Sequence, residues 1–383
     1  MPTFSYLYSC PYLLLWLWLL SLYSQEKKCN NYQKAKRYER IAITTIILFI
    51  GLRGFVYSDF TNYYVFFEYL PNIFDLTDFP YEPGFVIYSS IIKTIFPNYF
   101  IWIFINTLVD FYFFILVFRR YDTSLVLIFC FFIAYQGLGI EFNLLRNVKA
   151  IILFMYSIKF IEKRKIVPFI LCNLLGATFH YSALIYLPMY YLLNIEIPYK
   201  LKWGIIFFSA FTFLFGYSIS FWLLDHLQLD GETDLVKKAL IYTNDTSSYK
   251  LSFGFFERTF NICLLTYYYK RLNNAMSNFR ILYNCSLAFY VIFMLFSDVL
   301  VFVERFPVLF VFSYWIIFSC LFSRNIIRGK SKFLLIFLLF FSFFRIAKEN
   351  AHLLAKYENI LFGITDYKTR FNHADKVLNE FTY

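Results

Sequence analysis

The sequence predicts an all-α polytopic membrane protein, and three observations support that fold class. Of the 383 residues, 60% are hydrophobic and 24% are aromatic, whereas a water-soluble domain is usually about 45–50% apolar. The mean hydropathy is +0.56. Apolar runs of roughly 15–22 residues recur along the whole chain, and such runs are typical of membrane spans. We expect one membrane domain over residues 1–346 and a polar C-terminal tail over residues 347–383.

The charge, the cysteines and the N-terminal run all fit this class. The net charge is +11, and in membrane proteins an excess of Lys and Arg gathers in cytoplasmic loops, so we expect no nucleic-acid partner. The seven cysteines are scattered without a CxxC pair, which predicts buried, inert thiols. The apolar run at residues 4–24 lacks a basic segment before it and a small-residue cleavage motif after it, so we expect a retained span.

The distribution of charge between the first runs sets the predicted orientation. Residues 24–40 carry six Lys and Arg side chains against two Glu, which predicts a cytoplasmic loop. Residues 58–83 carry five acidic side chains and no Lys or Arg, which predicts an outer loop. The apolar segment at 85–96 is then too short to cross, because 12 residues of helix reach roughly 18 Å and the hydrocarbon core is roughly 30 Å thick. We therefore predict a re-entrant or interfacial half-helix there, lining a cavity.

The later runs complete a set of about 10–13 predicted transmembrane helices. With the half-helix in place, the remaining basic clusters all fall on the cytoplasmic side, and both chain ends fall outside. Residues 225–250 are predicted to form an outer polar loop. The predicted spans after the first are 41–57, 99–118, 125–139, 147–161, 166–179, 181–193, 203–224, 251–269, 281–302, 306–322 and 333–344.

Several charged side chains fall near the outer ends of these predicted spans. They are Arg53, Asp59, Glu82, Glu141, Arg146, His180, Glu304 and Arg305. Any one of them is explained equally well by a headgroup contact, by snorkelling or by pairing with a neighbour. Several charges at one boundary favour a functional site, because an unpaired charge in the hydrocarbon costs about 2.5–3.5 kcal/mol on insertion scales.

Three of these residues have side chains suited to distinct tasks. Arg146 starts a span, where a guanidinium can hold two phosphate oxygens at once. His180 lies between two apolar segments and is either a hydrogen-bonded helix-end residue or a proton shuttle or substrate contact. Glu82 precedes Pro83 and Gly84 at the start of the half-helix, where the helix dipole stabilises a carboxylate. A carboxylate in that place can equally accept a proton from a sugar hydroxyl.

In their order and spacing, these motifs resemble those of the EpsG family of bacterial polysaccharide-biosynthesis membrane proteins, which are similar in role to Wzy-type polymerases. The resemblance covers roughly residues 50–190. Three details depart from the family pattern: Asn147 stands where Gln is usual, Phe85 where Tyr is common, and Tyr57-Ser58-Asp59 replaces a Gly-x-Asp. The matching residues are Arg53-Gly54, Asp59, Tyr63, Glu82-Pro83-Gly84-Phe85, Arg146, His180-Tyr181-Ser182-Ala183 and Leu187-Pro188.

The resemblance implies that lipid-linked oligosaccharide repeat units are joined at the outer face of the bacterial cytoplasmic membrane. The growing chain would leave undecaprenyl pyrophosphate for a hydroxyl of the incoming unit. Arg146, Arg53 and Arg305 would hold the pyrophosphate, and Glu82, then His180, then Asp59 would serve as the base. The expected partners are the undecaprenyl-pyrophosphate-linked oligosaccharide, the bilayer and a regulator of chain length. No metal site and no cofactor are expected.

Three other functions remain open at this stage. A flippase for the same lipid-linked units would need charges at mid-span on several helices, whereas the spans here look mostly free of charge. A GT-C-like glycosyltransferase that uses a polyprenyl-phosphate sugar would place an acidic residue such as Asp59 in its first outer loop. A membrane O-acyltransferase would use one histidine but would take its acyl donor from the cytoplasm. The sugars, the linkage and the fate of the polymer are not encoded in any visible motif.

Overall fold

The computed structural model describes residues 2–216, 252–296, 305–324, 326–327 and 329–381. Within these ranges the regular structure is helical, with three isolated β-bridges. The helices of the first part are η1 (Tyr6–Ser9), α1 (Cys10–Lys28), α2 (Tyr32–Gly51), α3 (Phe60–Tyr69), η2 (Ile73–Asp75), α4 (Pro83–Ile95), α5 (Tyr99–Phe118), α6 (Leu125–Ala134), α7 (Gly137–Asn143), α8 (Asn147–Glu162), α9 (Ile166–Ala177), η3 (Tyr181–Tyr186), α10 (Met189–Leu192) and α11 (Tyr199–Phe215). Those of the second part are α14 (Phe253–Tyr267), α15 (Tyr269–Ala275), α16 (Phe279–Leu295), η4 (Pro307–Phe310), α18 (Phe312–Ser323), η5 (Gly329–Lys332), α19 (Phe333–Glu349), η6 (Leu353–Ala355) and α20 (Tyr367–Phe381).

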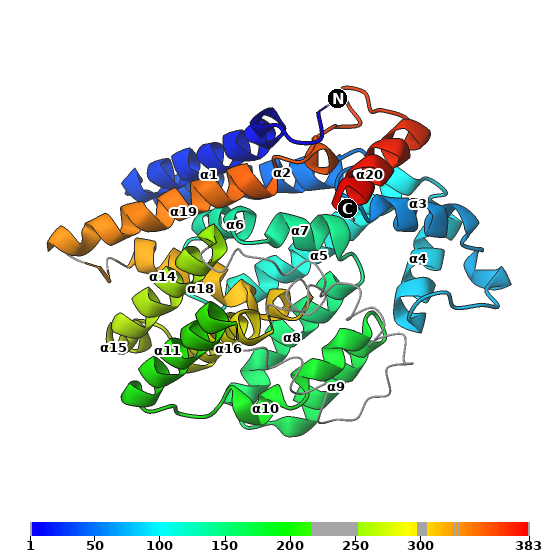
Figure 1. Cartoon of the computed structure of the whole chain (residues 1–383). Helices are drawn as coiled ribbons and strands as arrows, with labels where there is room; N and C mark the ends of the chain where they lie inside the picture. Colours follow the sequence, from blue (N-terminus) through cyan, green and yellow to red (C-terminus); the bar gives the residue numbers. More distant parts are fainter. Residues whose placement is uncertain (1, 217–251, 297–304, 325, 328, 382–383) are drawn as a thin grey trace.

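The helices pack as a bundle in which neighbours in sequence are often neighbours in space. α1 packs against α2 and α6, α8 packs against α9, and α18 packs against α6. α1, α2 and α19 form one layer at the top of Figure 1, and α3 and α4 lie at its right-hand end with α20 beside them. Asp59 and Glu82, which directly precede α3 and α4, therefore belong to this end of the bundle.

Helix length and composition test the membrane assignment directly. Among the described residues, two helical segments are long and apolar enough to cross a bilayer, Tyr6–Lys28 and α5. The pair α6 and α7 adds a third if this bent pair counts as one span. Shorter apolar helices include α9, α16 and α18. The all-α membrane class is confirmed, whereas the total of about 10–13 spans stays a prediction.

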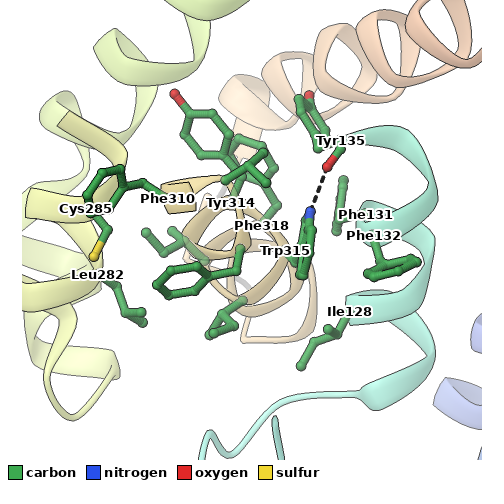
Figure 2. Close-up of a cluster of buried hydrophobic side chains, with 14 of the residues drawn as sticks. Ile128, Phe131, Phe132, Tyr135, Leu282, Cys285, Phe310, Tyr314, Trp315 and Phe318 are labelled. Atoms are coloured by element: carbon green, nitrogen blue, oxygen red, sulfur yellow. Dashed lines mark hydrogen bonds between the residues drawn. The ribbon is translucent and has the colours of Figure 1, made fainter. Parts of the chain in front are cut away.

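The connection between α6 and α7 is a sharp break inside an apolar segment. The two helices meet at 70°, and Gln136 adopts the left-handed conformation with φ 61°. A carbonyl freed by such a break must find another donor inside a membrane protein. The indole Nε1 of Trp315 donates to the Tyr135 carbonyl at 2.8 Å, inside the aromatic core drawn in Figure 2. The predicted straight span at 125–139 is therefore a bent pair.

Several predicted boundaries differ from those observed. The predicted loop at 24–40 is mostly helical, because α1 continues to Lys28 and α2 begins at Tyr32, where the Asn31 side chain accepts from two backbone N–H groups. The predicted outer loop at 58–83 contains α3 and η2. The predicted span at 181–193 consists of two short helices, because Pro188 interrupts it. The loop at 225–250 and Glu304 lie outside the described residues. The half-helix predicted at 85–96 is α4, 13 residues long.

The segment predicted as a polar tail folds back onto the α3–α4 end. Arg370 is 2% exposed, and its Nε donates to the Phe55 carbonyl at 2.8 Å. Gly54 donates its N–H to the Glu358 carbonyl at 2.8 Å. A Cβ on Gly54 would lie 2.7 Å from Cγ2 of Ile364, so glycine permits this close approach. The C-terminal segment therefore fixes the stretch that connects α2 to α3.

Candidate active site

The Glu-Pro-Gly motif brings the start of α4 against the end of α9. Glu82 is the residue before the helix, and Pro83 occupies its first position, where the missing N–H of proline has no intrahelical partner to lose. The N–H of Gly84 donates to the Thr178 carbonyl at 2.8 Å. A Cβ on Gly84 would lie 2.3 Å from Thr178 Oγ1 and 2.8 Å from that carbonyl oxygen. Glycine is required here because only a residue without a side chain allows this approach.

The approach places Glu82 in an ion pair with Arg146. Nη1 of Arg146 donates to Oε2 of Glu82 at 2.5 Å, and the backbone N–H of Tyr181 donates to Oε1 at 3.2 Å. The Glu82 side chain is 5% exposed and that of Arg146 is 24% exposed. Both Glu82 oxygens therefore have hydrogen-bond partners, which suits this carboxylate better to holding Arg146 than to accepting a proton.

The Arg146 guanidinium is held from a second side by an aromatic ring. Its Cζ lies 4.1 Å from the centroid of the Tyr81 ring, a cation–π geometry. Its Nε has no hydrogen-bond partner among the described residues. Tyr63 lies close by, and burial raises the Tyr63 pKa to about 12, with a further rise from the Asp59 charge that Arg146 opposes. A fixed, partly exposed guanidinium is suited to binding the oxygens of a phosphate group.

His180 lies at the same junction with one ring nitrogen already in use. Its Nδ1 accepts from the backbone N–H of Ser182 at 3.1 Å and lies 2.8 Å from the Ser182 hydroxyl. That hydroxyl donates to Oδ1 of Asn147 at 2.8 Å. Burial lowers the His180 pKa to about 4, and Arg146 and Arg305 lower it while Glu82 opposes them. The neutral ring then carries its proton on Nε2, which makes it a hydrogen-bond donor and not a base.

Asp59 has the properties of a base more clearly than the other two acid–base candidates. It precedes α3, and its side chain does not cap that helix. Burial raises the Asp59 pKa to about 6, although the positive charges of Arg305 and Arg146 oppose the rise. A general base works best when its pKa lies near the working pH. Arg305 is exposed and acts electrostatically on both Asp59 and His180. The structure thus brings Asp59, Glu82, Arg146, His180 and Arg305 together.

Arg53 lies apart from this group, in the interior. It is 4% exposed, and it donates to the Ile50 carbonyl at 2.7 Å and to the Glu141 carbonyl at 3.0 Å. Its Cζ lies 4.7 Å from the Phe142 ring centroid. The guanidinium connects the end of α2 to α7. The structure gives Arg53 a role in holding helices together, in contrast to the phosphate contact predicted for it.

A second polar cluster lies beside Arg53 and requires a correction. Lys149 donates from Nζ to Asp110 Oδ2 at 2.7 Å and to Asn106 Oδ1 at 2.8 Å. Glu141 is fully buried, and neither of its carboxyl oxygens has a hydrogen-bond partner in the described parts of the chain. The spans were expected to be mostly free of charge, and α5 is an exception because it carries Asp110 at mid-length.

Two contributors were missed in the sequence, for different reasons. Tyr81 is one of 34 tyrosines and had no signal except its place directly before Glu82. Asp110 did carry a signal, because a lone acidic residue inside an apolar run of 20 residues is rare and points to a buried partner. Within the described ranges, no group of three His, Cys, Asp or Glu side chains could hold a metal ion.

These features define a helical membrane protein with a charged site at one end of its bundle. A model of the EpsG family matches residues 36–359. The chain belongs to the EpsG family, and the matched range contains all six residues named above as candidates. Searches of curated proteins and of solved structures return no significant match.

Proposed function

We propose that this protein polymerises lipid-linked oligosaccharide repeat units into a bacterial surface polysaccharide. It does so at the outer face of the cytoplasmic membrane, which it crosses several times. The substrate is an oligosaccharide on undecaprenyl pyrophosphate, and the acceptor is a hydroxyl of a second such unit. The observation that carries the proposal is the partly exposed Arg146 guanidinium, which Glu82 and Tyr81 fix in place within the charged site.

The two arginines of the site bind the pyrophosphate of the donor. Arg146 supplies directed N–H groups, and Arg305 supplies exposed positive charge close to Asp59 and His180. Negative charge builds on the pyrophosphate as the glycosidic bond breaks, and donors already in position stabilise that charge without reorganising. Nε2 of His180 donates a further hydrogen bond to a substrate oxygen.

The group transfer needs one base. The acceptor hydroxyl oxygen forms a bond to the anomeric carbon of the donor while the bond from that carbon to the pyrophosphate oxygen breaks. Undecaprenyl pyrophosphate leaves with the electron pair, and the hydroxyl proton passes to the Asp59 carboxylate. Asp59 takes this role in place of Glu82, because both oxygens of Glu82 already accept hydrogen bonds. Glu82 is a positioning residue that orients Arg146.

Gene deletion in the host tests the proposal, with the surface glycan separated on a gel. The deletion strain is complemented with wild type, Arg146→Ala and Glu82→Gln at equal protein levels in the membrane. The matched control is Arg120→Ala, because the Arg120 side chain is 26% exposed and also pairs with a glutamate, Glu162 at 3.5 Å. We expect loss of high-mass polymer with Arg146→Ala and retention with Arg120→Ala. Undiminished polymer length with Arg146→Ala would overturn the assignment.

The same experiment separates the polymerase from a flippase, which the buried charges of the interior keep as the second candidate. The Asp110–Lys149 pair and the Glu141 carboxyl, which has no hydrogen-bond partner among the described residues, lie on three helices inside the bundle, and a flippase needs such mid-span charges. Complete repeats that accumulate outside the membrane indicate the polymerase, and complete repeats that accumulate inside indicate the flippase. Incomplete repeats indicate a GT-C-like glycosyltransferase, and an unchanged backbone that lacks acyl groups indicates an O-acyltransferase.

A further inference from the structure

A cavity beside the charged site is large enough for sugar residues. It has a volume of about 570 Å³, within the range of about 300–1,000 Å³ that is usual for ligand pockets. One wall is the face of α3 that carries Asn62, Phe66 and Tyr69, and the other is the segment that ends at Tyr81. We name it the α3 groove.

The side chains of the α3 groove match the chemistry of a pyranose ring. Phe66, Tyr69 and Tyr81 provide aromatic surface, and Thr61 and Asn62 provide hydroxyl and amide groups. Tyr69 is 85% exposed, so its ring is open to contact by a ligand. The apolar faces of a sugar pack on aromatic rings, while its hydroxyls need a few well-placed polar groups.

The charges of the α3 groove exclude a phosphate and favour an uncharged sugar. None of the described residues that line it is Lys, Arg or His, and one, Asp78, carries a carboxylate. An anionic group would therefore enter a space that offers it repulsion and no counter-charge. The neighbouring Arg146 site has the opposite character. The Arg146 site would thus contact the charged part of a glycolipid pyrophosphate, and the α3 groove would contact its carbohydrate part.

Tyr81 connects the two sites physically. The centroid of its ring lies 4.1 Å from Arg146 Cζ and 5.0 Å from the ring centroid of Phe66, on the α3 wall of the groove. A sugar attached to a phosphate at Arg146 would continue past Tyr81 into the groove. Asp59, the proposed base, precedes the helix whose first turn supplies Thr61 and Asn62.

The groove is preformed, because α4 holds the segment that ends at Tyr81 in place. The Ser90 hydroxyl donates to the Pro71 carbonyl at 2.7 Å, and Thr94 Oγ1 accepts from the Ile73 N–H at 3.0 Å. α4 also holds the α3 wall, because Lys93 Nζ donates to the carbonyls of Phe67 and Glu68 at 2.5 and 2.8 Å. A wall tied down by such bonds loses little entropy when a ligand binds.

We propose that the α3 groove binds uncharged or amino sugar residues of the repeat unit, next to the pyrophosphate at Arg146. This inference rests on the proposed function and adds the chemical class that the site selects. It assigns Tyr69 and Asn62 to substrate binding and Asp78 to the rejection of acidic sugars.

Binding to the protein in lipid nanodiscs tests the groove directly. The probe is the oligosaccharide released by mild hydrolysis from the surface polysaccharide of the host, and tetragalacturonate is the acidic comparison. We expect Tyr69→Ala to weaken binding of the released oligosaccharide about two- to tenfold, the factor associated with one lost aromatic contact. The matched control is Phe74→Ala, because Phe74, in η2, is 88% exposed but does not line the groove. Asp78→Asn should tighten binding of tetragalacturonate.

The outcomes separate the groove from the proposed function. Equal oligosaccharide binding by Tyr69→Ala and Phe74→Ala, or no binding by wild type, refutes sugar binding in the α3 groove. This holds even if the gene deletion still abolishes polymer. Tighter binding of tetragalacturonate than of the released oligosaccharide overturns the charge selection. If Arg146→Ala keeps normal polymer while Tyr69→Ala weakens sugar binding, sugar binding in the α3 groove is supported and the polymerase assignment based on Arg146 is refuted.

Discussion

Replacement of Gly84 by alanine tests whether the approach of α4 to α9 builds the site. Real Cβ contacts essentially never fall below 3.0 Å, and an alanine Cβ would lie 2.3 Å from Thr178 Oγ1, so about 0.7 Å of retreat is needed. The hydroxyl cannot turn away freely, because it donates to the Leu175 carbonyl at 2.7 Å. The Thr178 carbonyl oxygen, 2.8 Å from the same Cβ, has no rotamer at all.

Overpacking of this kind typically costs about 1–3 kcal/mol of stability. The larger effect falls on activity, because Glu82 lies two residues away and moves with the helix start, taking Arg146 with it. A misplacement of about 1 Å in a catalytic group can cost about a hundredfold in rate. We therefore expect the Gly84→Ala protein to remain folded, with a lowered melting temperature, and to make little high-mass polymer.

The assay is polymer formation in the deletion strain at equal membrane levels, together with the thermal stability of the purified protein. Gly204→Ala is the matched control, because Gly204 also lies in a helix and a Cβ there meets nothing within 4 Å. That variant should keep its polymer and its melting temperature. Normal polymer length and stability in Gly84→Ala would refute the argument from close approach.

Further predictions concern the charged residues. In membrane vesicles, polymerisation should rise as the pH rises through about 6, because the Asp59 carboxyl has a pKa raised to about 6 and works deprotonated; Asp59→Asn should abolish that limb of the pH profile. His180→Gln should lower the rate without moving the limb, because the His180 pKa is lowered to about 4 and the ring is already neutral. Arg146→Lys should retain only weak activity, since an ammonium cannot bind phosphate oxygens bidentately; wild-type activity would contradict this. Arg53→Ala should lower the free energy of unfolding by about 1.5–3 kcal/mol per lost charged hydrogen bond, seen as reduced thermal stability; loss of activity at full stability would return Arg53 to the substrate site.

The sequence alone determined the membrane class and the place of the short helix α4, whose position relative to the membrane stays a prediction. Apolar composition and run length are local properties, and they decide the solvent in which the chain folds. The Glu-Pro-Gly motif predicted a helix start correctly, because proline and glycine restrict the backbone wherever they stand. Five of the six candidate residues interact with one another in the structure, since charges at the same end of successive helices are carried to the same end of the bundle, while the task of each stays a prediction.

Tertiary structure alone decided which partners each of these residues contacts. Thr178 lies far from Gly84 in sequence, so only packing could show why glycine is needed there. Likewise, no local pattern directs Arg53 toward the Glu141 carbonyl, pairs Asp110 with Lys149 or returns the C-terminal segment to the connection before α3. The free energy of a buried charge depends on partners that other helices supply, and those partners exist only once the helices have packed.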